Sequence, residues 1–397
     1  MTRERIIGAV VAPHVSARAM RASPLWMRPN GSEHRTPILS RNAAEERGLA
    51  RLCCRRTSTA DVARAPQRPG RTITPSDGQD VEWPRVMSSA PLGHAVCISP
   101  SSMRSLQRTL ARPVEIEGIG LHTGVRTRLR LCPAPAYTGL LFRRTDLDGF
   151  EIPVSPQYVA RVSYATALVR AGVMVATVEH LLAALYACGV DNAIIEMNNL
   201  EVPILDGSAA PFVQMLARAG LRTSDAPRHY VRVRKPIQIG DAHQRILLSP
   251  DPAFRVSCVI EFPHPMIGQQ QRELVITEET FVEELAPART FGFLEDVETL
   301  RQKGLIRGGS LQNAIVLDRA GILNPEGLRF PDEFVRHKIV DLIGDLALIG
   351  HPLLARVEAW RPGHALNTAA VAALLRDPEA WELVAPTSTR LAEPVTP

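Results

Sequence analysis

The sequence predicts an α+β fold of two domains, because strand-like and helix-like segments are mixed in both halves of the chain beyond residue 102. Short runs of alternating apolar and polar residues indicate strands, and longer runs with apolar residues at helical spacing indicate helices. This pattern begins again after a proline- and arginine-containing stretch near residue 228. We therefore expect a first α+β domain over residues 103–228 and a second over residues 229–397.

The first half is expected to be rich in strands. Residues 109–134 alternate around a glycine-rich turn, which predicts a strand, a turn and a second strand. Helical spacing over residues 177–190 predicts a helix that stops near Gly189. A short strand over 192–198 and a helix over 208–221 complete this half.

The second half shows the same mixture, without a sequence repeat that relates it to the first. Strands are expected over residues 230–239, 244–250, 254–262 and, running into a turn, 355–363; helices are expected over 277–288, 332–350 and 364–377.

The composition fits a protein with a large core that spans no membrane. Apolar residues make up 45% of the 397 residues. No uninterrupted apolar run of about 18 residues occurs, which argues against a transmembrane helix. The six cysteines form no CxxC pair and no dense framework, so we expect a reduced protein in the cytoplasm.

The positive net charge comes from the N-terminal quarter alone. Residues 1–100 contain 15 arginines, no lysine and 8 acidic residues, a net charge of +7. The remaining 31 basic and 33 acidic residues have a net charge of −2. The charge of the folded part therefore does not support a nucleic-acid partner.

Residues 1–102 lack periodic apolar patterning and are rich in arginine, proline, serine and alanine. This composition is typical of disorder. Organelle transit peptides are also rich in arginine, but this segment contains carboxylates and no clean amphipathic helix, and it lacks the apolar region of a secretory signal. We favour a third interpretation, in which Met103 is the true first residue.

The helix expected over residues 332–350 contains a candidate metal site. His337 and Asp341 are four residues apart and therefore project from one helical face, where they could chelate a divalent ion. Asp345 adds a third polar group one turn further along, on a helix otherwise filled with Ile, Val and Leu. Buried ionisable groups need a partner or a cation. The alternative is a histidine that bonds a carboxylate one turn away, without a metal.

Glu179 and His180 stand together at the start of an expected helix. A carboxylate beside a metal ligand could act as general base toward a metal-bound water, whose pKa zinc lowers. The absence of HExxH here disfavours a zincin protease. An exposed glutamate beside a half-buried histidine is the alternative.

Two more segments contain residues suited to catalysis. His364 follows a Pro-Gly turn at a helix start, where Asp345 could raise its pKa and make it an acid for a leaving amine. Thr290 could stabilise an oxyanion, and Phe291 or Phe293 could stack on a sugar. The alternative for this second segment is a strand end with phenylalanines in the core.

Polar residues also occur in three turns that contain glycine. His122 and Asp206 could have a structural role there, because their side chains could form hydrogen bonds with backbone groups of the turn. Ser310 follows Gly308 and Gly309 in a turn that is too short for a P-loop and lacks its GK[ST] end, so nucleotide hydrolysis is not supported.

Seven segments occur in a characteristic order: EGIGLHTG, TVEHLLAAL, VPILDGSAAPF, ARTFGF, GGSLQNAIV, HKIVDLIGDLAL and GHALN. Together, from about Thr109 to Trp381, they resemble the bacterial UDP-3-O-acyl-N-acetylglucosamine deacetylases. The resemblance implies a zinc-dependent hydrolase of lipid A biosynthesis. Such an enzyme removes the N-acetyl group of UDP-3-O-(3-hydroxyacyl)-N-acetylglucosamine and releases acetate. We expect this small-molecule substrate, no nucleic-acid partner, no stable membrane insertion, and a monomer.

The resemblance also assigns the metal ligands and the base. His180, His337 and Asp341 match the family's three zinc ligands, which leave a fourth position open for water or the substrate carbonyl. Glu179 matches the general base. Iron(II) could replace zinc, since two histidines and an aspartate accept both ions.

Other matched residues are expected to act on the substrate. His364, backed by Asp345, matches the group that protonates the leaving amine, and Thr290 matches a residue that helps to hold the oxyanion. The expected substrate-binding residues are Lys338, Phe291, Phe293, His122 and Ser310.

The family's fold has two α+β domains, each layering helices on a sheet, with the zinc site between them. A β-α-β insert in the second domain forms an apolar passage for the acyl chain, and residues 293–317 correspond to that insert. Two features depart from the family pattern. One is the N-terminal extension, and the other is Arg307, where we expect a less charged residue and where a cation could alter the mouth of the passage.

Three rival interpretations remain open. The first is another zinc amidohydrolase with the same ligands, and the aromatic and apolar passage residues argue against it. The second is a non-catalytic binding protein of the same fold, which the presence of Glu179 and all three ligands disfavours. The third is an RNA- or membrane-binding protein that uses the arginine-rich leader; salt-dependent binding lost on deletion of residues 1–102 would support it.

Overall fold

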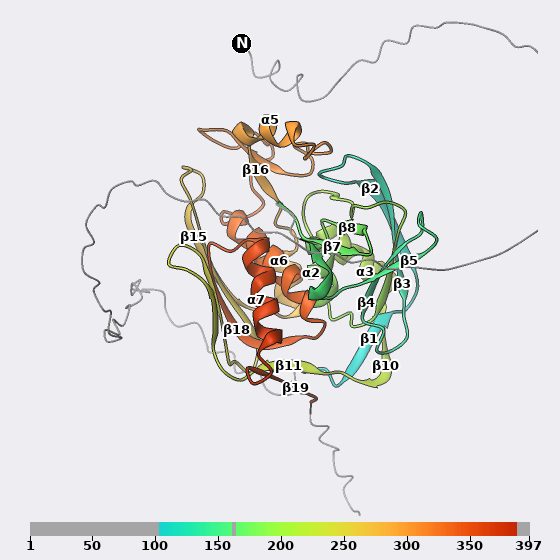
Figure 1. The fold of residues 1–397 in the computed structure, drawn as a ribbon. Helices are drawn as coiled ribbons and strands as arrows, with labels where there is room; N and C mark the ends of the chain where they lie inside the picture. Colours follow the sequence, from blue (N-terminus) through green and yellow to red (C-terminus); the bar gives the residue numbers. More distant parts are fainter. Residues whose placement is uncertain (1–102, 161–163, 387–397) are drawn as a thin grey trace, which may run out of the picture. The chain divides into compact units, whose positions relative to one another are not determined.

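Two large β-sheets, one from each half of the chain, hold a group of helices between them (Figure 1). The structure is a computed structural model that describes residues 103–160 and 164–386. The expectations of disorder over 1–102 and of a start at Met103 lie outside the described residues. Strands and helices occur in both halves, which confirms the mixed α and β character. The division into two domains stays a prediction.

The first half builds a five-stranded sheet in the order β2-β3-β9-β4-β5. In β3, arginines at alternate positions stay exposed while Leu129 and Leu131 are buried, as expected for a sheet with one face on the core. The strands are β2 (Val114–Ile119), β3 (Arg126–Pro133), β4 (Leu140–Arg144), β5 (Phe150–Pro153) and β9 (Ala193–Met197).

Smaller elements complete this half. Two strands pair as β1 (Leu106–Leu110) with β10 (Leu221–Pro227), and three as β6 (Val159–Ala160), β7 (Ala167–Arg170) and β8 (Val173–Ala176). The helices are η2 (Pro156–Tyr158), α2 (Glu179–Ala187) and α3 (Ala210–Ala219). The two helices expected in this half are therefore confirmed.

The second half builds a seven-stranded sheet. Its main path is β12-β13-β18-β11-β19, and β14 pairs with β18 and with β15. The strands are β11 (Tyr230–Val233), β12 (Ile237–Gly240), β13 (Arg245–Ser249), β14 (Phe254–Phe262), β15 (Gly268–Val275), β18 (Leu353–Trp360) and β19 (Trp381–Val384). Helices α6 (Glu333–Leu346) and α7 (His364–Arg376) lie against this sheet, and η4 (Ala347–Ile349) follows α6.

The prediction of a regular α-helix over residues 277–288 is wrong. The structure has a short α4 (Glu278–Thr280), which Thr277 caps, and then a π-helical turn η3 (Phe281–Leu285). The Ala286 amide donates to the carbonyl of Phe281, five residues back. Pro287 has no amide hydrogen to donate, so the helix cannot continue in the α form.

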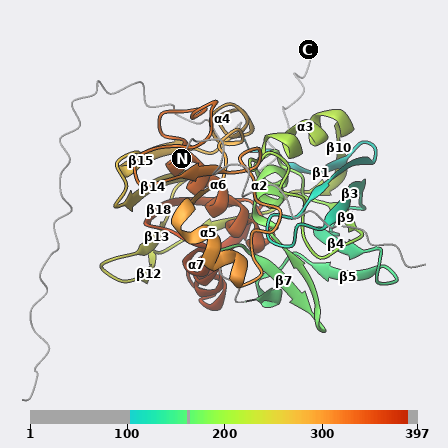
Figure 2. The same cartoon turned by 90° about the horizontal axis from the view of Figure 1, so that it is seen from above.

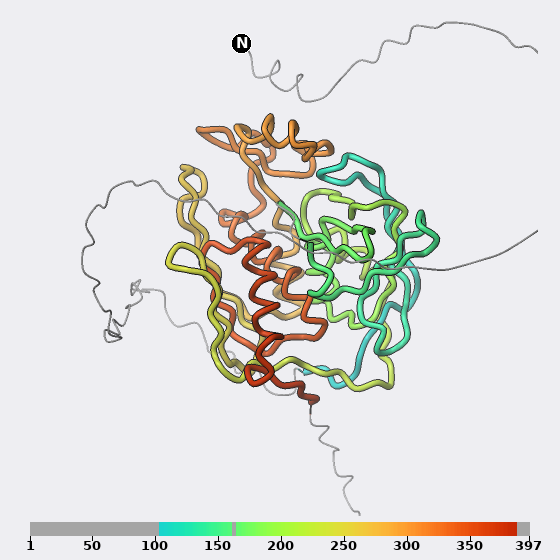
Figure 3. Tube along the Cα trace, viewed as in Figure 1, coloured from blue at the N-terminus to red at the C-terminus, as the bar shows by residue number. Residues whose placement is uncertain are grey.

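Helices α2 and α6 pack against each other between the two sheets, as both views show (Figures 1 and 2). Gly344 allows this close approach, because a Cβ atom there would lie 2.0 Å from the Glu179 carbonyl oxygen. Every residue of α6 except Lys338 is buried. The ionisable side chains of α6 are therefore held at the junction of the two halves, which Figure 3 shows as blue-green and yellow-red parts of the chain.

A β-α-β unit projects beyond the second sheet (Figure 1). Strands β16 (Phe291–Phe293) and β17 (Ile315–Leu317) pair in parallel, and α5 (Leu294–Gln302) lies between them in sequence. This unit covers the residues in which an insert is expected. No helix of the described residues is long and apolar enough to cross a membrane.

Candidate active site

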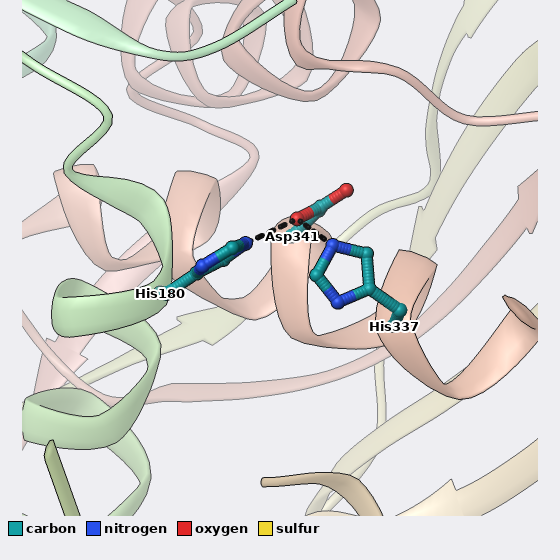
Figure 4. Close-up of side chains that lie close together, drawn as sticks. All are labelled: His180, His337 and Asp341. Atoms are coloured by element: carbon teal, nitrogen blue, oxygen red, sulfur yellow. Dashed lines mark ion pairs between the residues drawn. The ribbon is translucent and has the colours of Figure 1, made fainter. Parts of the chain in front are cut away.

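Two histidines and an aspartate come together where α2 meets α6 (Figure 4). Asp341 Oδ1 lies 3.4 Å from His180 Nε2 and 3.3 Å from His337 Nε2. Each residue offers one ligand atom, and the three atoms lie within 4.8 Å of one another. All three residues are buried, and buried groups of this kind require compensating protons or a cation.

The donor set fits a divalent metal ion. Two imidazoles and a carboxylate make up a common three-residue ligand set for catalytic zinc. The carbonyl oxygen of Ala288 lies 3.1 Å from His337 Nδ1. A proton on Nδ1 that bonds this carbonyl leaves Nε2 free for a metal, which is the usual outer-sphere arrangement.

Electrostatics favour states of His180 and Asp341 that are able to bind a metal. Burial lowers the pKa of His180, which favours the neutral imidazole. Burial alone would raise the pKa of Asp341, but the Lys338 ammonium and the His337 ring hold it well below its usual range. Lys338 Nζ donates to Asp341 Oδ2 at 2.8 Å. The cluster therefore offers one carboxylate and, at His180, a ring whose neutral form is favoured.

Glu179 is the first residue of α2, directly before His180, and it is buried. Its Oε2 accepts a hydrogen bond from the Thr166 amide at 3.1 Å. Burial raises the pKa of the Glu179 carboxyl to about 7, although the nearby His364 opposes this rise. A carboxylate with this pKa can take up and release a proton at neutral pH, as a general base must.

His364 is the first residue of α7, and its Nδ1 lies 2.9 Å from Asp345 Oδ2. Burial alone would lower the pKa of His364, but the charges of Asp345 and Glu179 raise it to about 10. The ring is thus an imidazolium at neutral pH, and it can give up a proton. The pairing of His364 with Asp345 that the sequence predicts is confirmed.

Sequence reasoning missed two residues that surround Asp345. The Thr166 hydroxyl donates to Asp345 Oδ1, and Asn367 Nδ2 donates to Asp345 Oδ2 at 2.8 Å. Asn367 had a detectable signal, because it lies three residues after His364 on the same helical face. Thr166 had none, since its partner is 179 residues away in the sequence.

Comparison with known proteins identifies the family. The sequence model of the UDP-3-O-acyl N-acetylglycosamine deacetylases matches residues 107–376. The chain belongs to this family. Family membership confirms that the protein is an enzyme and that the seven segments were correctly interpreted. The family is metal-dependent, and His180, His337 and Asp341 form a possible site for the metal.

Several curated relatives bear the name UDP-3-O-acyl-N-acetylglucosamine deacetylase. The relative from Solibacter usitatus is 52% identical over 73% of this chain and 97% of its own length. The relative from Myxococcus xanthus is 49% identical over 72% of this chain and 90% of its own length. For Neisseria meningitidis the identity is 44%, over 70% of this chain and 93% of the relative. The matched region contains all the candidate site residues.

Within this deacetylase, Phe291 of β16 lies next to the cluster of His180, His337 and Asp341. The Phe291 ring centroid is 6.4 Å from that of His337 and 5.0 Å from that of Phe334 in the core. Lys338 Nζ lies 5.7 Å from the Phe291 centroid. Phe293 contacts Phe262 of β14, with 5.9 Å between the centroids. Phe291 thus lies between the cluster and the core, and its contact with the sugar stays a prediction.

Thr290 stands between Ala288 and β16. Ala288 bonds the ring of His337, as described above, and the Thr290 amide donates to the Gly207 carbonyl at 2.8 Å. These bonds anchor the backbone of Thr290 near the cluster. Asp206, beside Gly207, accepts a hydrogen bond from the Ser208 amide at 3.0 Å, in keeping with the structural role that its turn indicates.

His122 and Ser310 lie on turns that contact each other, because the Arg307 amide donates to the His122 carbonyl at 3.1 Å. Burial lowers the pKa of His122; the charge of Glu201 opposes this shift, and the charge of His364 adds to it. Neither ring nitrogen of His122 has a hydrogen-bond partner among the described residues. The Ser310 amide donates to Asn313 within its own turn, at 2.8 Å.

Proposed function

We propose that this enzyme hydrolyses the N-acetyl group of UDP-3-O-(3-hydroxyacyl)-N-acetylglucosamine, giving the free amine and acetate, at the committed step of lipid A biosynthesis. The observation that carries the proposal is the position of Glu179 and His364 beside a cluster of His180, His337 and Asp341. A base, an acid and a metal site together are what metal-assisted amide hydrolysis uses. The names of the curated relatives support the choice of substrate.

We infer that His180, His337 and Asp341 hold the metal, which we take to be zinc, with iron(II) as the alternative. When bound there, such an ion polarises the acetamide carbonyl and lowers the pKa of a water molecule. The buried ligands and the His337 ring, oriented by Ala288, support this assignment.

The chain's own groups then move the protons. Glu179 takes a proton from the water as its oxygen attacks the acetamide carbon, and the Thr290 hydroxyl donates to the oxyanion. The C–N bond breaks as the His364 imidazolium gives its proton to the leaving nitrogen. Asp345 faces the other ring nitrogen of His364, so it supports the charged ring without contacting the substrate.

A cavity beside the cluster suits the nucleotide part of the substrate. It has a volume of about 320 Å³ and is lined by Lys338, Arg361 and Phe262, among others. Cationic side chains bind phosphate oxygens, and an aromatic face accepts a base. The same cavity contains Asp241 and Glu261, so its net charge is close to balanced. Lys338 lines this cavity and also bonds Asp341 of the candidate metal site.

We further propose that the β16-α5-β17 unit lines a passage for the acyl chain. Leu294, Val297 and Leu300 follow one another at helical spacing on α5, and all three are only partly buried. A helix that leaves an apolar face incompletely covered has surface to offer to an apolar ligand. Arg307 lies on the loop of this unit and is exposed.

We also propose that the enzyme works in the cytoplasm as a monomer. The three cysteines among the described residues, Cys132, Cys188 and Cys258, are all free, as expected in a reducing compartment. We further propose that the chain has two domains, one built on each large sheet, with the site between them.

The test is acetate release by the purified chain from UDP-3-O-acyl-N-acetylglucosamine, before and after chelation. We expect chelation to remove activity and zinc to restore it. A folded, zinc-loaded protein that releases no acetate would contradict the proposed reaction. Competition by other N-acetylated sugars would show whether the substrate is instead that of a different amidohydrolase.

A further inference from the structure

We propose that Glu201 is a positioning residue that holds two parts of the active site in register. One part is Thr177, which leads into α2, and the other is the loop that carries His122. Glu201 is 1% exposed, and its carboxylate bonds none of the proposed metal ligands or proton-transfer groups. The inference rests on the proposed deacetylation, because it assigns Glu201 a role in that reaction.

The Glu201 carboxylate accepts four hydrogen bonds, all from neutral donors. Oε1 accepts from the His122 amide at 2.8 Å and from Thr177 Oγ1 at 2.9 Å. Oε2 accepts from the Thr123 amide at 2.8 Å and from Thr123 Oγ1 at 2.6 Å. A buried carboxylate is costly unless hydrogen bonds stabilise its charge. The four donors and the carboxylate therefore hold one another in place.

On the α2 side, Glu201 supports a strained residue. Thr177 has a φ of 56°, a conformation that β-branched residues rarely adopt and that persists only where its surroundings hold it. The hydroxyl bond to Glu201 supplies one restraint, and a backbone bridge between Ala176 and Glu201 supplies another. Glu179 and His180 follow Thr177 by two and three residues. The conformation of Thr177 therefore sets the start of α2 and the position of both side chains.

On the loop side, the backbone wraps closely around the carboxylate. A Cβ atom on Gly120 would lie 2.2 Å from Glu201 Oε2, so only glycine allows this approach. The Gly124 amide closes the loop onto the Gly120 carbonyl at 3.0 Å. The Gly308 amide donates to the Leu121 carbonyl at 3.0 Å, so the loop also contacts the turn before Ser310.

Glu201 thus has two arms, and both lead to the active site. The α2 arm is its bond to Thr177, and the loop arm consists of its bonds to the backbone and side chains of the His122 loop. The loop arm holds the turn that carries His122, and the α2 arm places Glu179, whose Oε1 is 3.8 Å from His364 Nε2. One carboxylate thus bonds both the loop of His122 and the residue that leads to the proposed base. Misplacement of reacting groups by about 1 Å can cost about 100-fold in rate. Loss of Glu201 would therefore impair catalysis without removing any catalytic group.

Three variants of the full chain separate the two arms. Glu201→Gln replaces one acceptor oxygen with an amide that cannot accept, and we expect kcat/KM to fall about 10- to 100-fold. Thr177→Val removes only the hydroxyl bond of the α2 arm. It should lower kcat and speed the loss of zinc to a chelator. Thr123→Val removes the hydroxyl bond to Glu201 and the acceptor of the Val125 amide, both within the loop arm. It should raise KM while zinc retention stays unchanged.

Asp191→Asn is the matched control. Asp191 is also a largely buried carboxylate of the first half, and it accepts bonds from the Arg108 amide at 2.8 Å and from Arg228 Nε at 2.7 Å. Thermal unfolding of all variants shows how much stability each has lost. A positioning role predicts that Glu201→Gln loses far more activity than Asp191→Asn at an equal loss of stability.

Two results would overturn the inference. One is wild-type kinetics and zinc retention in Thr177→Val and Thr123→Val, which decide the matter even if Glu201→Gln does not fold. The other is a loss of activity in Glu201→Gln that merely equals that of Asp191→Asn. Absence of acetate release by the wild-type chain would instead contradict the proposed function. Zinc retention in Thr177→Val would still test the α2 arm in that case.

Discussion

His364 Nε2 lies 3.8 Å from Glu179 Oε1, so the proposed acid and the proposed base directly influence each other's charge. The imidazolium lowers the pKa that burial raises in Glu179, and the carboxylate helps to raise the pKa of His364. Thr166 links them a second time, because its amide bonds Glu179 and its hydroxyl bonds Asp345. The proposed proton transfer therefore depends on a connected group of side chains.

The first prediction concerns pH. Glu179 must be ionised to accept a proton, and its pKa of about 7 means that activity rises as pH increases through that value. His364 must be protonated to donate, and its pKa of about 10 means that activity falls as pH increases through that value. We expect a bell-shaped profile of kcat/KM between these limits.

Asp345→Asn tests the assignment of the alkaline limb. Removal of this negative charge should lower the pKa of His364, because Asp345 is the main group that raises it. The alkaline limb of the profile should then move to lower pH. An unchanged alkaline limb in a folded, metal-loaded variant would show that another group controls it.

Glu179→Ala should retain its metal but lose most turnover. The side chain is not one of the three ligands, and general base catalysis typically contributes about 10²- to 10⁴-fold. Metal analysis of the purified variant and its kcat check both parts of the prediction. A near-normal rate would refute the role of Glu179 as base.

Asp341→Ala should abolish metal retention, because it removes the carboxylate that lies within reach of both histidine ligands. Asp332→Ala is the control at the start of the same helix, where Asp332 bonds only arginine side chains. We expect that variant to keep its metal. Full zinc stoichiometry in Asp341→Ala would rule out the proposed ligand set.

Gly344→Ala should destabilise the protein and reduce its activity, because α2 and α6 would have to separate where they hold the site. Overpacking of this kind typically costs about 1–3 kcal/mol. Gly321→Ala is the matched control, since a Cβ atom there meets nothing within 4 Å. Denaturant unfolding of both variants measures the difference, and equal stabilities would contradict the close approach.

Local sequence patterns were sufficient for several parts of the site. Helical periodicity alone places His337 and Asp341 on one face of α6. In the structure both side chains are part of the same cluster, together with His180. The π-helical turn at η3 was not predicted, because the 3.6-residue pattern looks alike in both helix types until Pro287 interrupts it.

By itself, the sequence predicted helices α2, α3, α6 and α7, the shared face of His337 and Asp341, and the seven segments that mark the family, because each depends on residues close together in the chain. Only the tertiary structure decided how His180 reaches that pair, since this depends on the contact of Gly344 with the backbone of Glu179. It also decided the partners of Thr166 and Glu201. Hydrogen bonds between distant segments follow from packing, and no local periodicity records them.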